Sequence, residues 1–160
     1  MTDDSEPDKP WGNTLLVRAE VRSTGGRRLT GFVHLQPNAP GHNGPETLED
    51  LLGRPGGFFP LTDERHHTVF LAKDQVLAVS IAADAGLEDP ARLSAARNLG
   101  LEVELSDGTA LAGTVPLELP PARNRAIDFL NQSSGFIGLH AADAIHFVNR
   151  RHVRVATPFD

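Results

Sequence analysis

The sequence contains no cysteine. This absence excludes disulfides, zinc sites built from thiolates and cysteine nucleophiles, and it leaves the redox environment of the protein open. No run of about 18 apolar residues occurs, so we expect no segment that crosses a membrane. The acidic stretch MTDDSEPDKP at residues 1–10 lacks the apolar centre of a secretion signal. Together these absences predict a cytoplasmic protein.

Catalytic and cofactor motifs are lacking as well. The chain has no Walker A or dinucleotide fingerprint, and Ser133-Ser134 lacks the context of a nucleophile elbow. No histidines form a metal-binding pattern such as His-Glu-x-x-His. We interpret four of them as solvated loop residues: His66, His67, His140 and His146. The sequence therefore predicts a protein that is not an enzyme, without a cofactor or a metal site.

The chain also lacks an excess of positive charge, since its net charge is -6. A broad nucleic-acid footprint is disfavoured, since phosphate binding needs a positive surface. Much of the acidity lies in residues 1–13, which we expect to be a disordered acidic tail. Hydrophobic residues make up 39% of the chain, which is enough for a packed core.

The remainder of the chain contains an internal repeat, whose three blocks occur in the same order in both halves. The aligned segments are 17–35 with 99–117, 50–61 with 128–139, and 70–78 with 147–155. The second pair reads DLLGRPGGFFPL and DFLNQSSGFIGL. Self-similarity of this kind is typical of a duplicated structural unit.

These alignments predict four regions along the chain. They are the tail 1–13, a first β-barrel repeat at 14–82, a linker at 83–97, and a second β-barrel repeat at 98–160. Asp89 and Pro90 are good residues to begin a helix, so we expect a short helix at about 90–97. The first repeat carries an insertion rich in proline, glycine and asparagine within 36–49, which predicts a surface loop.

Each repeat is expected to begin with a β-hairpin. Alternating apolar residues from Leu99 to Leu105 predict a half-buried strand, and Asp107-Gly108 predicts a tight turn. Gly31 and Gly113 occupy the same position in the return strand, where glycine indicates a bend or a close backbone approach. A helical segment within 123–131 and three short strands follow, at about 136–140, 144–149 and 152–156. Each repeat thus has five strands and one helical segment.

This order of elements resembles the Sm-like fold of Sm, Lsm and Hfq proteins. VELSDGTALAGTV (Val103–Val115) is similar to the first Sm motif, and HFVNRRHVRVATP (His146–Pro158) is similar to the second. The resemblance implies a mainly β protein of two tandem five-stranded Sm/SH3-like barrels, and it implies RNA binding by rings of barrels. The phrase Arg-x-x-Asp-Phe-Leu-Asn at 125–131 resembles small uncharacterised bacterial domains, from which no function follows.

Two groups of basic residues are candidates for anion or partner contacts: Arg123, Arg125, Arg150, Arg151, His152 and Arg154. Arginine pairs bind phosphate or carboxylate groups in bidentate fashion. In the alternative interpretation, Asp128 caps its local helix and the arginines are solvated. The segment 123–133 also resembles the arginine and Asn-x-Ser motifs of c-di-GMP-binding PilZ barrels, but its spacings differ from theirs.

Two functions are compatible with these observations. The first is a non-catalytic intracellular adaptor or assembly module, which binds a protein partner or itself through barrel edges or the 36–49 loop. The alternative is an Sm-like RNA- or nucleotide-binding protein that uses the arginines near 123–125 and 150–154. Neither function involves a membrane. Nucleic-acid affinity falls steeply as salt rises, whereas an apolar interface tolerates salt.

Overall fold

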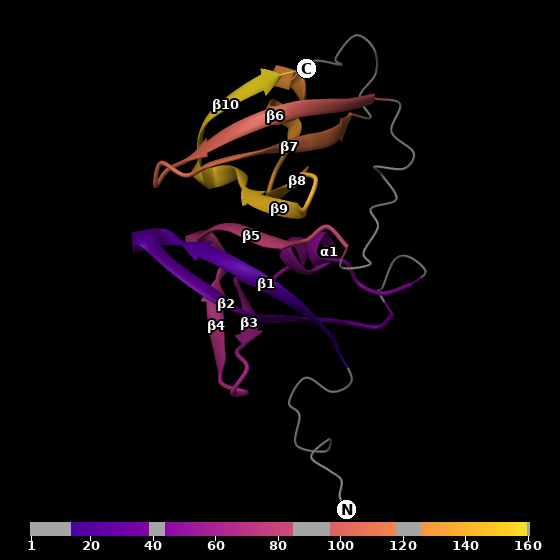
Figure 1. Cartoon of the computed structure of the whole chain (residues 1–160), viewed down its shortest axis with the longest axis vertical. Coiled ribbons are helices and arrows are strands. Elements are labelled where there is room, and N and C mark those ends of the chain that lie inside the picture. Colours follow the sequence, from indigo (N-terminus) through magenta and orange to yellow (C-terminus); the bar gives the residue numbers. More distant parts are fainter. Residues whose placement is uncertain (1–13, 39–43, 85–96, 118–125, 160) are drawn as a thin grey trace, which may run out of the picture.

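The computed structural model describes residues 14–38, 44–84, 97–117 and 126–159. The first half (14–84) contains β1 (Leu15–Ser23), β2 (Arg27–Leu35), α1 (Leu48–Gly53), β3 (Phe58–Thr62), β4 (Thr68–Ala72) and β5 (Val76–Ala82). The second half (97–159) contains β6 (Arg97–Leu105), β7 (Ala110–Leu117), α3 (Ala126–Gln132), β8 (Phe136–His140), β9 (Ala144–Asn149) and β10 (Val153–Phe159). Single 3-10 turns form η2 (Thr24–Gly26), η3 (Lys73–Gln75) and η5 (Arg150–His152). Figure 1 shows the two halves one above the other.

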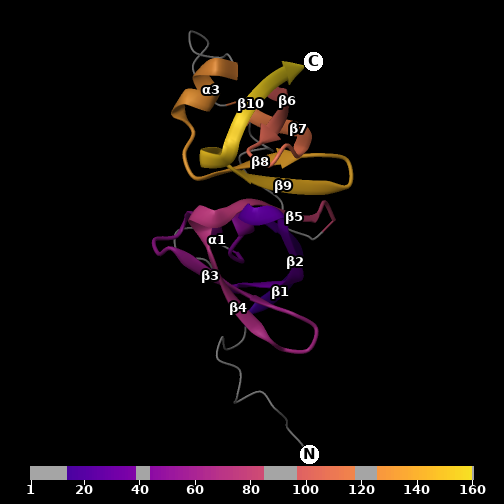
Figure 2. The ribbon, with the colours of Figure 1, turned by 90° about the vertical axis from the view of Figure 1, so that its left-hand side faces the viewer.

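The protein is mainly β, as expected, but its strands are joined in one open antiparallel sheet. The ten strands follow the order β10-β6-β7-β8-β9-β5-β1-β2-β3-β4. The halves meet where β5 pairs with β9, and we call this strand pair the seam. Both ribbon views place the seam in the middle of the molecule (Figures 1 and 2). The two repeats therefore share one continuous sheet that ends at β4 and β10, and the expected pair of five-stranded barrels is not confirmed.

Strand registers in the two halves follow the sequence alignment. Ala19 pairs with Gly31 in the first hairpin, and Leu101 pairs with Gly113 in the second. The pairing of β5 with β1 is interrupted by a register shift beside Ser23, and that of β10 with β6 by a shift after Val153. Each half thus has the same order of five strands, in which the last strand lies beside the first.

The glycines in the return strands allow a close backbone approach, as the sequence indicates. A Cβ atom on Gly31 would lie 2.8 Å from the backbone oxygen of Thr62. One on Gly113 would lie 2.9 Å from the backbone nitrogen of His140. Each glycine directly precedes the single residue pair that joins its strand to the next one, β2 to β3 in the first half and β7 to β8 in the second. A side chain at either position would push these strands apart.

Two hydrophobic clusters form the core, and the strands of the seam contribute to both. The first cluster is built mainly from the first half but includes Ile145 and Phe147 of β9. The second is built mainly from the second half but includes Leu77 and Ala78 of β5. Successive side chains of a strand point to opposite faces, so a central strand can serve two layers. Each half is completed by residues of the other.

Several expectations lie wholly or partly outside the described residues. They are the tail 1–13, most of the linker 83–97 with its helix, and part of the loop 36–49. Arg97, the expected end of the linker, is the first residue of β6. The expected helical segment is confirmed at Ala126–Gln132. In the four described ranges, none of the helices has the length and apolar character to span a bilayer.

Candidate functional site

Three of the candidate basic residues form η5, the turn between β9 and β10. The guanidinium Nε of Arg150 donates to the backbone oxygen of Leu130 at 2.9 Å. Nη1 of Arg151 lies 3.1 Å from Oδ1 of Asp74, and Nε2 of His152 lies 2.7 Å from the backbone oxygen of Asp74. The turn therefore holds the second half against η3 of the first half.

The remaining candidates are placed differently. Arg154 lies on β10, and its Nη2 donates to Oε2 of Glu104 on the neighbouring strand β6 at 2.5 Å. Arg123 and Arg125 lie outside the described residues. The structure thus brings Arg150, Arg151 and His152 together on one turn, with Arg154 close by in sequence. An anion at this turn would compete with the existing contacts of these side chains.

The seam contains two polar residues that do not belong to the two groups of candidate basic residues. Asn149 is 3% exposed, and its Nδ2 donates to the backbone oxygens of Lys73 and Val76 at 3.1 and 2.9 Å. His146 is not a solvated loop residue, because it lies on β9 and its Nδ1 is 2.7 Å from Oγ of Ser80. Burial lowers the pKa of His146 below its ordinary value. Both side chains tie β9 to the first half.

A buried carboxylate organises the loop before α1. Glu46 is 1% exposed, and its Oε1 accepts a hydrogen bond from the backbone nitrogen of Gln36 at 2.9 Å. Arg54 donates to both of its oxygens, at 2.5 and 2.6 Å. Nζ of Lys73 reaches the backbone oxygen of Arg54 at 2.9 Å, and burial lowers the pKa of this lysine. These groups satisfy one another, which is typical of a structural network.

Asp50 in α1 has a similar structural role. Its side chain accepts from the backbone nitrogen of Thr47 at 3.0 Å, and the Thr47 hydroxyl accepts from the nitrogen of Asp50 at 3.1 Å. This reciprocal pair is a capping box, which satisfies two backbone donors at the start of a helix. The repeated aspartate in the first half therefore stabilises a helix end.

The two end strands of the sheet carry exposed apolar side chains. On β4, Val69 is 42% exposed and Phe70 is 62% exposed. On β10, Val155 is 48% exposed and Phe159 is 46% exposed. By contrast, Phe147 of β9, which aligns with Phe70, is only 7% exposed because β9 lies inside the sheet. Exposed apolar groups on an open strand edge are typical of interaction surfaces.

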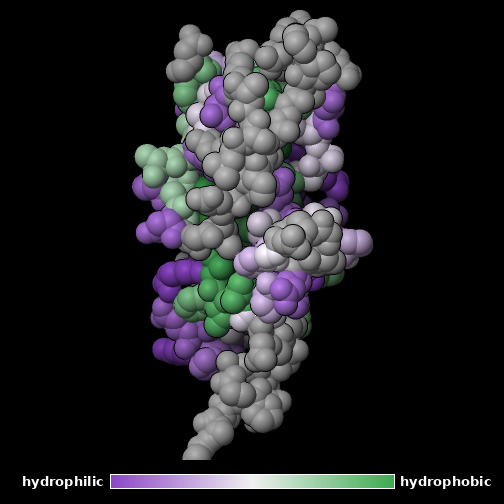
Figure 3. Space-filling view, turned by 90° about the vertical axis from the view of Figure 1, so that its right-hand side faces the viewer, coloured by the Kyte–Doolittle hydropathy of each residue, from purple (hydrophilic) through white to green (hydrophobic). Residues whose placement is uncertain are grey.

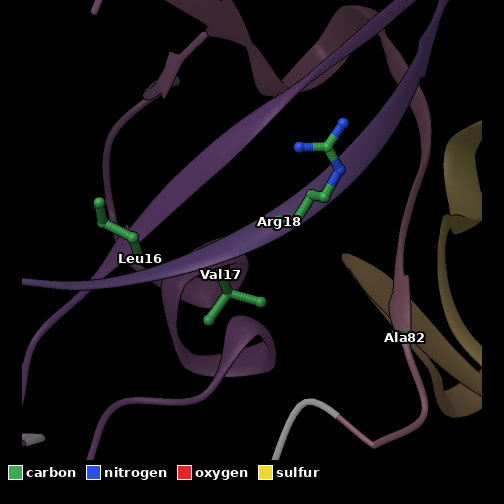
Figure 4. Close-up of a pocket in the computed structure, with 4 residues that line it drawn as sticks. All are labelled: Leu16, Val17, Arg18 and Ala82. Carbon is green, nitrogen blue, oxygen red and sulfur yellow. The ribbon is translucent and has the colours of Figure 1, made fainter. Parts of the chain in front are cut away.

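A shallow hollow near the start of β1 is less suited to binding. It is lined by Leu16, Val17, Arg18 and Ala82 (Figure 4). Figure 4 shows Leu16 and Arg18 pointing away from each other, so the lining side chains do not converge on a shared point. The only charged group, Arg18, is held by Glu64 at 2.8 Å. A pocket with one already paired polar group provides little to orient a ligand.

The face that Figure 3 shows has hydrophobic side chains gathered in its lower half, with hydrophilic ones around them. On β1, Leu15 and Leu16 are 40% and 57% exposed. The described ranges hold no group of three or more side chains arranged to bind a metal ion.

Comparisons of the chain with protein-family models, with curated proteins and with solved structures found no significant match. Among the described residues, the two sheet ends and the basic turn η5 are exposed features whose chemistry suits a partner.

Proposed function

We propose that this chain is a non-catalytic assembly module in which two Sm/SH3-like β-barrels, one from each repeat, are fused side by side. The common strand order and matching registers of the two halves support a duplicated unit. The two core clusters support one barrel-like layer in each half. The fusion occurs at the seam, where β5 pairs with β9.

The observation that carries the proposal is the character of the sheet ends. Within the described part of the chain, β4 pairs only with β3, and β10 pairs only with β6. An edge strand presents backbone N–H and C=O groups that can pair with another chain. The exposed apolar residues Val69 and Val155 add hydrophobic contact area at these edges. A protein partner bound by strand addition would use both features.

A pull-down from native lysate tests this function. The bait is the whole chain, compared with Val69→Lys and Val155→Lys, because a lysine on an edge strand opposes strand addition. We expect wild-type bait to retain protein after nuclease treatment, and at least one edge variant to lose it. Leu16→Lys, which changes an exposed residue of β1, is the matched control. Equal capture by all four baits would contradict the proposal, as would capture that nuclease abolishes.

A second candidate, Sm-like binding of RNA or nucleotides, is favoured by the exposure of the basic side chains. Arg151 and Arg154 are 70% and 57% exposed at the side chain, although both have acidic partners. Fluorescence anisotropy with single-stranded RNA at low salt tests this candidate. Binding that falls steeply with salt, and that weakens in the Arg151→Ala and Arg154→Ala variants, would support it. No binding at low salt would exclude it.

A further inference from the structure

We infer that the partner of the sheet ends is a second copy of this chain, and that β10 of one copy pairs with β4 of the next. This inference rests on the proposed assembly function and specifies its partner. The pairing follows the geometry of the seam, which joins the corresponding strands within one copy. The seam within one copy is therefore the same kind of strand pairing as the proposed contact between copies.

The correspondence of the strands follows from their neighbours in the sheet. β5 lies beside β1 with Val79 opposite Val21, and β10 lies beside β6 with Ala156 opposite Val103. Val21 and Val103 are aligned residues of the two repeats. Ala156 therefore occupies on β10 the position that Val79 occupies on β5.

The register of the seam then predicts the register between copies. In the seam, Val79 lies opposite Phe147, and Ser80 lies opposite His146. The position of Phe147 on β9 corresponds to that of Phe70 on β4, because Phe147 pairs with Gly138 of β8 as Phe70 pairs with Pro60 of β3. The contact between copies accordingly sets Ala156 opposite Phe70.

The next residue pair of that contact sets Thr157 opposite Val69. The apolar Val69 stands in the place of His146, and Thr157 in the place of Ser80. The polar contact between Ser80 and His146 is thus replaced by a contact of methyl groups, which β-branched residues on paired strands make well.

Aromatic residues show what this contact would bury. Phe147 is 7% exposed in the first core cluster, and Phe136 packs partly buried against the same cluster. At the corresponding positions of the first half, Phe70 is 62% exposed and Phe58 is 65% exposed. Pairing of β4 with β10 would place these two rings against the second core cluster of the neighbouring copy.

The charges at the turns are also complementary. At the seam, Arg151 of η5 lies 3.1 Å from Asp74 of η3. These two residues occupy corresponding positions in the two halves. At the contact between copies, Arg151 of the copy that contributes β10 therefore lies near Asp74 of the copy that contributes β4. Opposite charges at both contacts favour this arrangement over one that joins two identical edges.

The contact is directional and weaker than the seam. Each copy uses two different edges, so copies join head to tail and form a closed ring or an open filament, depending on the rotation between them. Ala72 replaces Asn149, so the two hydrogen bonds of that amide are missing. Pro158 on β10 has no backbone N–H to donate. Assembly should consequently reverse on dilution.

Light scattering on the purified chain over a range of concentrations tests the inference. We expect a mass above that of one chain at high concentration, and a single-chain mass for Phe70→Lys or Val155→Lys alone. A mixture of these two variants retains one intact β10 and one intact β4, so it should form a two-chain complex and nothing larger. Leu16→Lys is the matched control and should assemble like the wild type.

Three outcomes would overturn the inference. They are a wild-type chain that keeps a single-chain mass at every concentration, edge variants that assemble as the wild type does, and one edge variant that dimerises alone, which would mean that identical edges pair. Val69→Lys replaces Phe70→Lys if the latter does not give the circular dichroism of the wild type. A single-chain mass combined with edge-dependent capture of another protein would leave the assembly function standing, since only the identity of the partner would be wrong.

The absence of cysteine allows a direct test of the register. Val69→Cys and Thr157→Cys chains are mixed under mild oxidation, because directly opposed strand residues lie within disulfide range. We expect the mixture to form a cross-linked pair faster than either chain alone. Ala156→Cys is the matched control, since its side chain points to the other face of the sheet. Equal yields for Thr157→Cys and Ala156→Cys would contradict the register.

Discussion

At the scale of single residues, the first half depends on the buried carboxylate of Glu46. It accepts from the backbone of Gln36 and from the guanidinium of Arg54, and so closes the loop onto α1. We expect Glu46→Gln to lower the free energy of unfolding by about 2 kcal/mol, because charge-assisted hydrogen bonds are lost while Arg54 can turn to solvent. Urea denaturation measures this change.

The matched control is Glu64→Gln, which removes the carboxylate that pairs with Arg18. That carboxylate is 70% exposed, so the free energy of unfolding should change by less than about 1 kcal/mol. Equal effects of the two substitutions would mean that the burial of Glu46 does not matter to stability.

The seam histidine makes stability depend on pH. Burial lowers the pKa of His146 in the folded chain below the ordinary histidine value of 6.5, and burial also lowers the pKa of His34. The unfolded chain therefore takes up these protons first, so stability should fall as the pH drops through about 6.5 towards the folded pKa values. Carboxylates whose pKa values are lowered affect the pH dependence of stability only at more acidic pH.

This dependence is measured as urea midpoints between about pH 7.5 and pH 5.5. His146→Asn can keep a hydrogen bond to Ser80 without titrating, so the loss of stability between these two pH values should be smaller than in the wild type. An equally steep loss in the variant would show that His146 does not contribute.

At the scale of elements, the return strand of each hairpin depends on its glycine. We expect Gly113→Ala to lower the free energy of unfolding by about 1–3 kcal/mol, because the added Cβ would lie 2.9 Å from the backbone of His140. Gly57→Ala is the control, since a Cβ there has no neighbour within 4 Å. Thermal melts of both variants give the comparison, and a larger loss at Gly57 would refute the steric explanation.

Local features of the elements could be predicted from the sequence, but the seam could not. The alternation at 99–105, the Asp107-Gly108 turn and the strands at 136–140 and 144–149 depend on neighbouring residues, and the structure has them. Pairing of β5 with β9 joins backbones far apart in the chain, and backbone hydrogen bonds have no sequence signature. The continuous apolar run of β5, Val76–Val79, was the available signal, because such a run is typical of a strand buried on both faces.

The candidate site, likewise, can be predicted from the sequence only in part. The basic turn 150–152 can be predicted because three consecutive basic residues stand out in an acidic chain. Its contact with Asp74 was not predicted, because it depends on the seam. His146 falls within the expected strand 144–149, but its contact with Ser80 cannot be predicted, since only the pairing with β5 brings Ser80 beside it.

At the scale of the whole molecule, the shared clusters predict a single unfolding unit. Phe147 belongs to the second half but packs in the first core cluster. We expect Phe147→Ala to cost about 3–5 kcal/mol and to speed hydrogen exchange equally in β1–β2 and in β6–β7. Exchange that accelerates in only one half would mean that the halves unfold separately.

The two-sided burial of β5 also constrains how the chain can change over time. A substitution at Leu77 alters the packing of the second core cluster, while one at the nearby Val79 alters that of the first. Neither half can therefore accumulate mutations in this strand independently of the other. In our proposal the two halves descend from one ancestral unit. Selection nevertheless acts on β5 through both halves at once. A mutation in this strand should therefore be compensated by changes in both halves rather than in one.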